Sequence, residues 1–223
     1  MKMIALICGL LVARVAAVDR EPLYKWFEGI DPENVLYAVN CGAEEPHTDL
    51  SGITYNADEG YSGGEASSAG SSQKWVIVNS DVYQTERWAS EDFNYGLPFD
   101  PNVDAKYVVV LKFSEQYFRE PYMKVFDVAL GDTTVLKELD IFARAGQKLL
   151  PFDEFIEIEM KRGKLYFNGR QVRGALRNNK LHVNFNKGSV DNPKINAIVL
   201  VQGGIDNTHK KSFLKFQKTL KEI

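Results

Sequence analysis

Hydrophobic residues recur along this chain in short runs, with turn-forming residues between the runs. The run at 107–113 is rich in valine and aromatic residues, and the run at 125–130 alternates between its two faces. Both patterns are typical of β-strands. The connecting segment, 116–122, contains Pro121, which has no N–H to donate to a strand partner. We therefore predict two strands and a loop, arranged as a central hairpin.

The rest of the chain repeats this pattern, without a long amphipathic helix before its end. Residues 152–160 show the alternation of a strand with one wet face, and Asn168-Gly169 is a strong hairpin signal. The segment 57–72, ADEGYSGGEASSAGSS, is too poor in apolar residues for a core and predicts a surface loop. We predict an all-β, jelly-roll-like β-sandwich. Its further strands or strand-like pieces are expected at 35–39, 53–55, 76–78, 82–84, 134–142, 165–167, 181–185 and 195–201.

The two ends of the chain differ from this middle part. Residues 1–17 combine Lys2, a short apolar run and small residues, which predicts a secretory signal peptide. Residues 18–34 form a polar lead-in arm, and the sandwich domain is expected over 35–205. In 206–223, apolar residues at helical spacing lie among lysines, which predicts a basic amphipathic helical tail. Such a tail could lie on a membrane, but we favour a helix or frayed end beside the sandwich.

Charge and cysteine content narrow the possible functions. Without the signal peptide the chain keeps 25 of its 27 basic residues against 30 acidic ones, a poor composition for binding nucleic acid. Cys8 leaves with the signal peptide, so Cys41 is the only cysteine of the mature chain and no internal disulfide can form. Cys41 is interpreted as a small buried residue rather than a nucleophile.

The sequence contains no motif of a common enzyme class. No nucleophile elbow, zinc-protease motif, phosphate-binding loop or dinucleotide fingerprint occurs, and the three histidines lack metal-ligand spacing. We therefore expect no cofactor and no metal site. A glycoside hydrolase would need two carboxylates at a set separation. The obvious acidic cluster, Glu154, Glu157 and Glu159, is interpreted as a solvated strand face.

Seven stretches, in matching order across 35–202, together resemble the malectin family of endoplasmic-reticulum lectins. They are LYAVNCGAEEPHTDLSGITY, VYQTERW, YVVVLKFSEQYF, KVFDV, LKELDIF, MKRGKL and DNPKINAI. The resemblance implies a β-sandwich that binds carbohydrate and is not an enzyme. It further implies diglucosylated high-mannose N-glycans of new glycoproteins as ligands and association with ribophorin of the oligosaccharyltransferase complex. The expected location is the endoplasmic-reticulum lumen or the secreted fraction. No counterpart of the family's C-terminal membrane anchor occurs in this sequence.

The resemblance also implies a set of sugar-binding residues. Trp88 stands where the family has tyrosine, and Tyr61 is the nearest ring to a family tyrosine, in S-D-Y-G, that has no clear match here. The others match the family's Tyr-Phe pair, its D-N-P-K aspartate and its Gly-Gly-Glu turn: Tyr117, Phe118, Asp191, Gly42, Ala43 and Glu44.

The chemistry of these residue types agrees with this assignment. A pyranose stacks its apolar C–H face on aromatic rings, and its hydroxyls donate to charged acceptors. A ring at Tyr117 or Phe118 could instead fold back into the core. The alternative function is a protein-interaction module that kept the sandwich and lost the sugar pocket.

Overall fold

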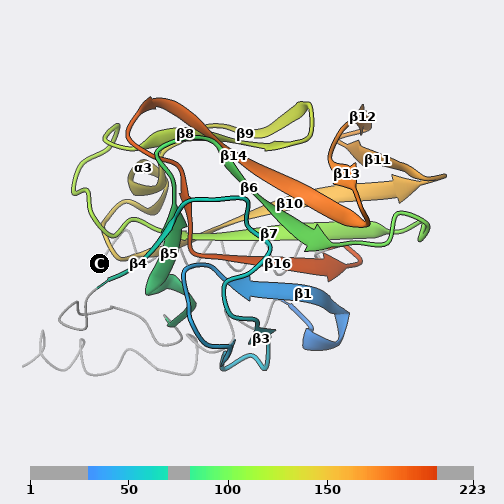
Figure 1. The fold of residues 1–223 in the computed structure, drawn as a ribbon, viewed down its shortest axis with the longest axis horizontal. Helices are drawn as coiled ribbons and strands as arrows, with labels where there is room; N and C mark the ends of the chain where they lie inside the picture. Colours follow the sequence, from blue (N-terminus) through green and yellow to red (C-terminus); the bar gives the residue numbers. More distant parts are fainter. Residues whose placement is uncertain (1–29, 70–80, 205–223) are drawn as a thin grey trace, which may run out of the picture.

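The computed structural model describes residues 30–69 and 81–204. Two antiparallel sheets pack face to face (Figure 1), which confirms the predicted all-β sandwich. The six-stranded sheet has the order β1 (Val35–Asn40), β16 (Ala197–Gln202), β7 (Lys106–Ser114), β10 (Pro151–Lys161), β11 (Lys164–Phe167) and β12 (Arg170–Val172). The five-stranded sheet contains β13 (Leu176–Arg177), β14 (Lys180–Val190), β8 (Val125–Leu130), β9 (Thr133–Leu139) and, paired to β14, β6 (Phe93–Pro98).

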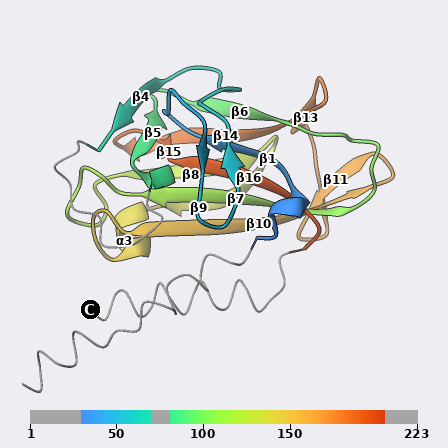
Figure 2. The ribbon, with the colours of Figure 1, turned by 90° about the horizontal axis from the view of Figure 1, so that it is seen from below.

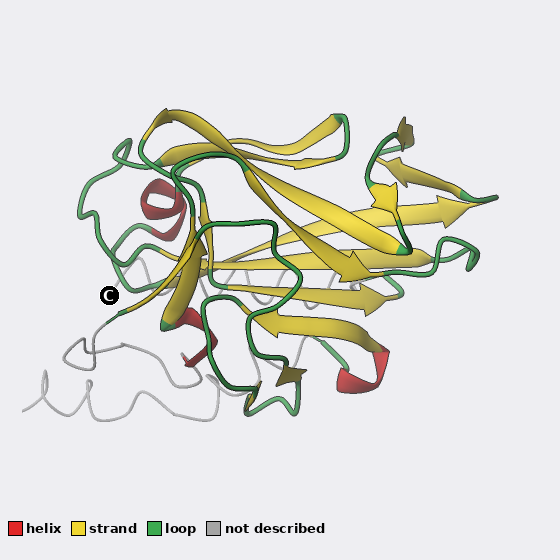
Figure 3. Ribbon diagram, viewed as in Figure 1, coloured by secondary structure: helices red, strands yellow, loops and turns green. Residues whose placement is uncertain are grey.

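Smaller elements complete the fold (Figure 3). A three-stranded sheet joins β15 (Lys194–Ile195), β5 (Thr85–Trp88) and β4 (Glu65–Ser68), and β2 (His47–Thr48) pairs with β3 (Thr54–Tyr55). The helical elements are η1 (Pro32–Asn34), η2 (Asp81–Tyr83) and α3 (Ile141–Ala145). The three-stranded sheet and α3 lie at the same end of the sandwich in Figure 1 and Figure 2.

The main core lies between the two large sheets. It contains Val109 and Leu111 of β7, Val128 of β8 and Phe185 of β14, all without solvent exposure. A second cluster covers the other face of the six-stranded sheet, where Val108 and Val110 of β7 meet the β2–β3 region and η2. Burial on both faces explains why the sequence of β7 is apolar throughout instead of alternating.

The pairing of β7 and β8 corrects the predicted central hairpin. Both strands exist, but β7 pairs with β10 and β16, whereas β8 pairs with β14 and β9. The loop 115–124 therefore crosses from one sheet to the other at the end of the sandwich. Strand composition predicts the strands, while their partners depend on residues far away in sequence.

Four local predictions are also corrected. The strand-like piece at 82–84 overlaps η2, and Asp81 accepts from the backbone and side chain of Gln84, just after it, at 3.0 and 2.9 Å. The Gly/Ser-rich segment predicted as a loop contains β4, which pairs with β5. The predicted strand at 134–142 ends before α3, whose N-cap Asp140 accepts from Ala143 N at 2.9 Å. The predicted strand at 181–185 is too short, because β14 continues to Val190.

Several predictions fall on parts of the chain outside the described residues. They are the signal peptide at 1–17, the part of the arm before residue 30, the strand at 76–78 and the tail at 206–223. Within the described ranges, no helix has the length and apolar character needed to cross a membrane. Cys41 is buried, as predicted, and burial raises the pKa of its thiol.

Candidate functional site

The loop 115–124 presents a pair of aromatic rings at the end of the sandwich. The buried carboxylate of Glu115 accepts hydrogen bonds from the backbone N–H of Tyr117 at 2.8 Å and of Phe118 at 3.0 Å. The two rings meet edge to face, with centroids 5.0 Å apart. Tyr117 is 78% exposed, which excludes a core role for this ring, whereas Phe118 is half-buried. The sequence places the rings here because Glu115 fixes the backbone that carries them.

Lys124 connects this loop to the segment after β14. Its ammonium lies 5.6 Å from the centroid of the Phe118 ring and donates to the carboxylate of Asp191 and to Asn192 O. Lys124 is buried, and these two acceptors satisfy its ammonium there. The ion pair therefore holds Asp191 next to the aromatic loop, although the two segments are far apart in sequence.

Asp191 stands at a special backbone position. Its φ is +57°, in the left-handed region that aspartate tolerates better than most residues. Its Oδ2 accepts from Lys124, and among the described residues no donor contacts Oδ1. The carboxylate is thus fixed by one oxygen and has the other available for a ligand.

Strand β5 contributes the third group of side chains to the candidate site. Alternation along a strand places Glu86 and Trp88 on the same face, and Ser67 of β4 pairs opposite Glu86. The Glu86 carboxylate accepts from Ser67 Oγ at 3.3 Å and from the ammonium of Lys194. Lys194 is fully buried and also donates to Ser114 O. A buried lysine therefore compensates the charge of Glu86, as Lys124 does for Asp191.

These segments enclose a groove of about 380 Å³, here called the first groove. Its walls come from β4, β5, the aromatic loop and the segment after β14. The lining residues are Ser67, Glu86, Trp88, Tyr117, Lys124, Asp191 and Asn192. The structure thus brings together Trp88, Tyr117 and Asp191, which the sequence placed in one site, and Phe118 supports Tyr117 and Lys124 from beside the groove.

Sequence reasoning missed Glu86 as a groove residue. It lies in the quoted stretch VYQTERW, two positions before Trp88. The sequence could have indicated Glu86, because a strand at 85–88 would place the side chains of Glu86 and Trp88 on one face. Its pairing with buried Lys194 could not be read from the sequence.

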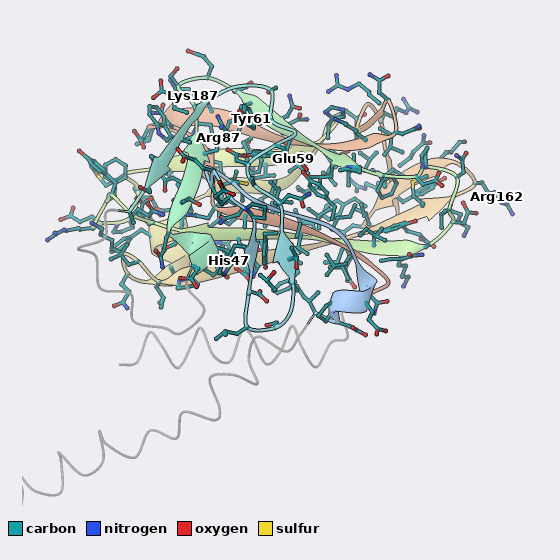
Figure 4. The ribbon with its side chains drawn as sticks, turned by 60° about the horizontal axis from the view of Figure 1, so that its bottom comes forward. His47, Glu59, Tyr61, Arg87, Arg162 and Lys187 are labelled. Atoms are coloured by element: carbon teal, nitrogen blue, oxygen red, sulfur yellow. The ribbon has the colours of Figure 1, made fainter. Side chains whose placement is uncertain are left out.

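Tyr61 does not line the first groove. Its ring stacks on the guanidinium of Arg87 at 3.4 Å and meets Tyr95 edge to face at 6.2 Å (Figure 4). Arg87 alternates with Trp88 along β5, so it points to the other face of that strand. Arg87 in turn donates to Asp58 at 2.7 Å, and Tyr95 donates to the same carboxylate at 2.6 Å. Burial and the nearby Cys41 and Asp58 raise the pKa of Tyr95, so its hydroxyl stays a donor.

The turn Gly42-Ala43-Glu44 also lies outside the first groove. A Cβ on Gly42, whose φ is +81°, would lie 2.2 Å from the carbonyl oxygen of Glu86. Ala43 O accepts from Asp58 N at 2.8 Å, and Glu44 is exposed. Gly42 therefore lets this turn pack against the backbone of β5, behind the groove residues.

The described residues also contain no group of three or more histidine, cysteine, aspartate or glutamate side chains that could hold a metal ion. The groove offers aromatic faces, two charge-compensated carboxylates and a serine hydroxyl. These groups suit an uncharged ligand that carries hydroxyls and has an apolar face.

Two comparisons relate the chain to known proteins. The sequence model of the Malectin domain family matches residues 35–198. Malectin of Homo sapiens is 40% identical over 186 residues, covering 80% of this chain and 60% of that protein. Malectin of Mus musculus is 41% identical over 188 residues with the same coverage, and Malectin-A of Xenopus laevis is 41% identical over 182 residues, covering 78% and 62%. The chain thus spans about three fifths of the length of these relatives.

Solved structures with the same fold come from plant receptors. The extracellular domain of ANXUR2 from Arabidopsis thaliana superposes with a TM-score of 0.60 at 17% identity, over 78% of this chain and 50% of that one. The ANXUR1 extracellular domain gives 0.61 at 16% identity, over 78% and 49%. At this identity the likeness concerns the fold alone. The family match over most of the chain and the identity to the malectins show more: this chain belongs to the malectin domain family.

Proposed function

We propose that this protein is a lectin whose first groove binds carbohydrate, without catalysing a reaction. The observation that carries the proposal is the convergence of Trp88, Tyr117 and Asp191 in one groove. These residues come from three separate segments, and each matches a sugar-binding position implied by the malectin resemblance. Glu86 adds an acceptor that the resemblance did not supply.

The geometry supports a sugar ligand in three ways. Trp88 and Tyr117 offer flat apolar surface for the C–H face of a pyranose. Asp191 Oδ1 is free to accept from a hydroxyl, and a charged acceptor makes the stronger hydrogen bond. The two carboxylates are each compensated by a lysine, so an uncharged ligand meets no unbalanced charge.

The same ion pairs argue against a hydrolase. A glycosidase needs one carboxyl that holds a proton and donates it to the leaving oxygen. Glu86 and Asp191 each accept from the ammonium of a buried lysine. Both carboxylates of the groove are therefore already engaged as acceptors by lysines, an arrangement that suits ligand binding better than proton donation to a leaving group.

The specific ligand in this proposal is a terminal α-glucosyl unit, as on diglucosylated N-glycans of newly made glycoproteins. A volume of about 380 Å³ lies within the usual range for small-ligand sites. An open, wet groove gives modest affinity, which suits transient inspection of many glycoproteins. The proposed location is the endoplasmic-reticulum lumen or the secreted fraction, with ribophorin of the oligosaccharyltransferase complex as a candidate partner.

A glycan array tests this proposal. Selective binding of glycans ending in α-glucosyl units, over the same glycans trimmed of glucose, is the expected result. Trp88→Ala applied to the same array should lose the signal. An array without any bound glycan would instead favour the alternative function, a protein-interaction module on the same sandwich.

A further inference from the structure

A second groove of about 580 Å³, here called the second groove, lies beside the first. Residues that are adjacent in the chain, at the start of β8 and at the end of β14, contribute to the two grooves. Lys124 lines the first groove and Val125 the second, while Asp191 lines the first and Val190 the second. Val125 and Val190 are paired across β8 and β14, and each directly adjoins in sequence a residue of the first groove.

Irregular strand pairing shapes the second groove. The register between β14 and β8 shifts between Lys187 and Val190, and a Cβ on Gly188 would lie 2.1 Å from Val125 O. A bulge of this kind turns side chains away from the regular ladder. The bulge forms one wall of the second groove and leads directly to Asp191 in the first groove. Lys187 lies at this part of the surface (Figure 4).

Tyr122 forms the aromatic part of the second groove. Its ring is 76% exposed, although its backbone has φ +64°, a costly conformation for a residue with a bulky side chain. The buried carboxylate of Asp140, which also caps α3, accepts from Tyr122 N. The fold thus fixes the backbone that presents this exposed ring, which reduces the entropic cost of ordering the loop when a ligand binds.

The polar lining of the second groove is mixed in sign. Lys137 and Glu138 are exposed at its edge, and Asp127 accepts from Glu138 N at 2.7 Å. Lysines and carboxylates thus supply donors and acceptors together, next to the apolar lining residues Val125 and Phe126. An anion or a cation would meet groups of its own sign here, whereas a sugar can pair its hydroxyls with both.

We propose that the second groove is a further sugar subsite, in which Tyr122 stacks on a residue of the oligosaccharide whose end occupies the first groove. This proposal rests on the carbohydrate binding proposed above. It adds that the protein recognises an oligosaccharide longer than a disaccharide. A disaccharide fills the first groove alone, and a longer chain reaches Tyr122.

The test compares disaccharides with tetrasaccharides by calorimetry on the full mature chain. The probes are nigerose and nigerotetraose, with maltose and maltotetraose as the second linkage. A tetrasaccharide contains three adjacent pairs of units, so a gain of about threefold in affinity needs no second groove. The expected gain for wild type is about tenfold or more. Tyr122→Ala should reduce the gain to about threefold or less while leaving disaccharide affinity unchanged, and Tyr122→Phe, the matched control, should keep the gain of about tenfold.

Two further variants make the outcomes distinguishable. Trp88→Ala should weaken both ligand lengths, since it acts in the first groove. Lys137→Ala, an exposed change at the second groove, should lower only tetrasaccharide affinity. If Tyr122→Ala keeps the full tenfold gain, the second groove is not a sugar subsite, although the proposed lectin function stands. If wild type binds none of the four saccharides, the lectin function fails and this inference fails with it.

Discussion

Lys124 donates from its buried ammonium to the carboxylate of Asp191, 67 residues further along the chain. This ion pair joins the aromatic loop before β8 to the segment after β14. It uses one oxygen of Asp191 and leaves the other without a donor among the described residues, in a side chain that lines the groove with Trp88 and Tyr117. The proposed sugar site therefore depends on a long-range contact.

Asp191→Asn tests the acceptor. Asparagine tolerates the positive φ of this position and keeps the shape of the side chain while removing its charge. Binding of nigerose or maltose should weaken by roughly 1–2 kcal/mol in calorimetry, because a charged acceptor is lost. Glu45→Gln, an exposed change outside the groove, is the control and should bind like wild type. If both variants bind the disaccharide with equal affinity, Asp191 is not an acceptor for the sugar.

The ring at position 88 is tested by two substitutions. Trp88→Ala removes stacking area and should weaken disaccharide binding by about 1–2 kcal/mol. Trp88→Tyr restores the residue of the malectin pattern and should keep binding. Melting temperatures serve as the control: if Trp88→Ala melts far below wild type, the ring is a structural element of the half-buried β5 surface rather than a ligand platform.

Gly42→Ala tests the turn behind β5. The added Cβ would approach the Glu86 carbonyl oxygen to 2.2 Å and would also require a positive φ. The expected loss is about 2 kcal/mol or more in the free energy of unfolding by urea. Gly163→Ala is the matched control, because Gly163 has φ +69° and no atom within 4 Å of the added Cβ. Gly163→Ala should lower the free energy of unfolding by only about 0.5–1 kcal/mol, which is the effect of the backbone conformation alone. Equal losses would show that the approach to Glu86 does not matter.

Alkaline pH should destabilise the fold. Burial raises the pKa of Cys41, Tyr55, Tyr83 and Tyr95. The folded chain therefore keeps protons that the unfolded chain releases above about pH 9 to 10, so stability falls as pH rises through that range. Urea unfolding at pH 8 and pH 10.5 measures the difference. An unchanged free energy of unfolding would contradict the burial of these groups.

The strands were predictable where the pattern is local. The alternation at 152–160 corresponds to β10, which has one wet face at Glu157 and Glu159. The pairing of β7 with β10 and of β8 with β14 was not predictable, since the paired residues lie more than thirty positions apart in sequence (for example Ser114 with Pro151). Likewise β4 forms in a Gly/Ser-rich segment because β5 supplies its hydrogen-bond partners.

The site was predictable only through its motifs. Trp88, Tyr117 and Asp191 were matched one by one, and the structure brings them into one groove. Tyr61 was chosen by its proximity in sequence to a missing tyrosine, but Arg87 holds its ring elsewhere. The charge compensation by Lys124 and Lys194 depends on the packing of distant segments, so the sequence did not reveal it.

The location of the sugar is the central claim, and chemical-shift mapping tests it most directly. A ¹⁵N-labelled sample titrated with nigerose should show progressive shifts of the Trp88 indole N–H and of the backbone amides of Tyr117, Asp191 and Asn192. The amide of Tyr61, outside the groove, should stay in place. Shifts confined to Tyr61 and the Gly42 turn, or no shifts at all at millimolar disaccharide, would contradict the account.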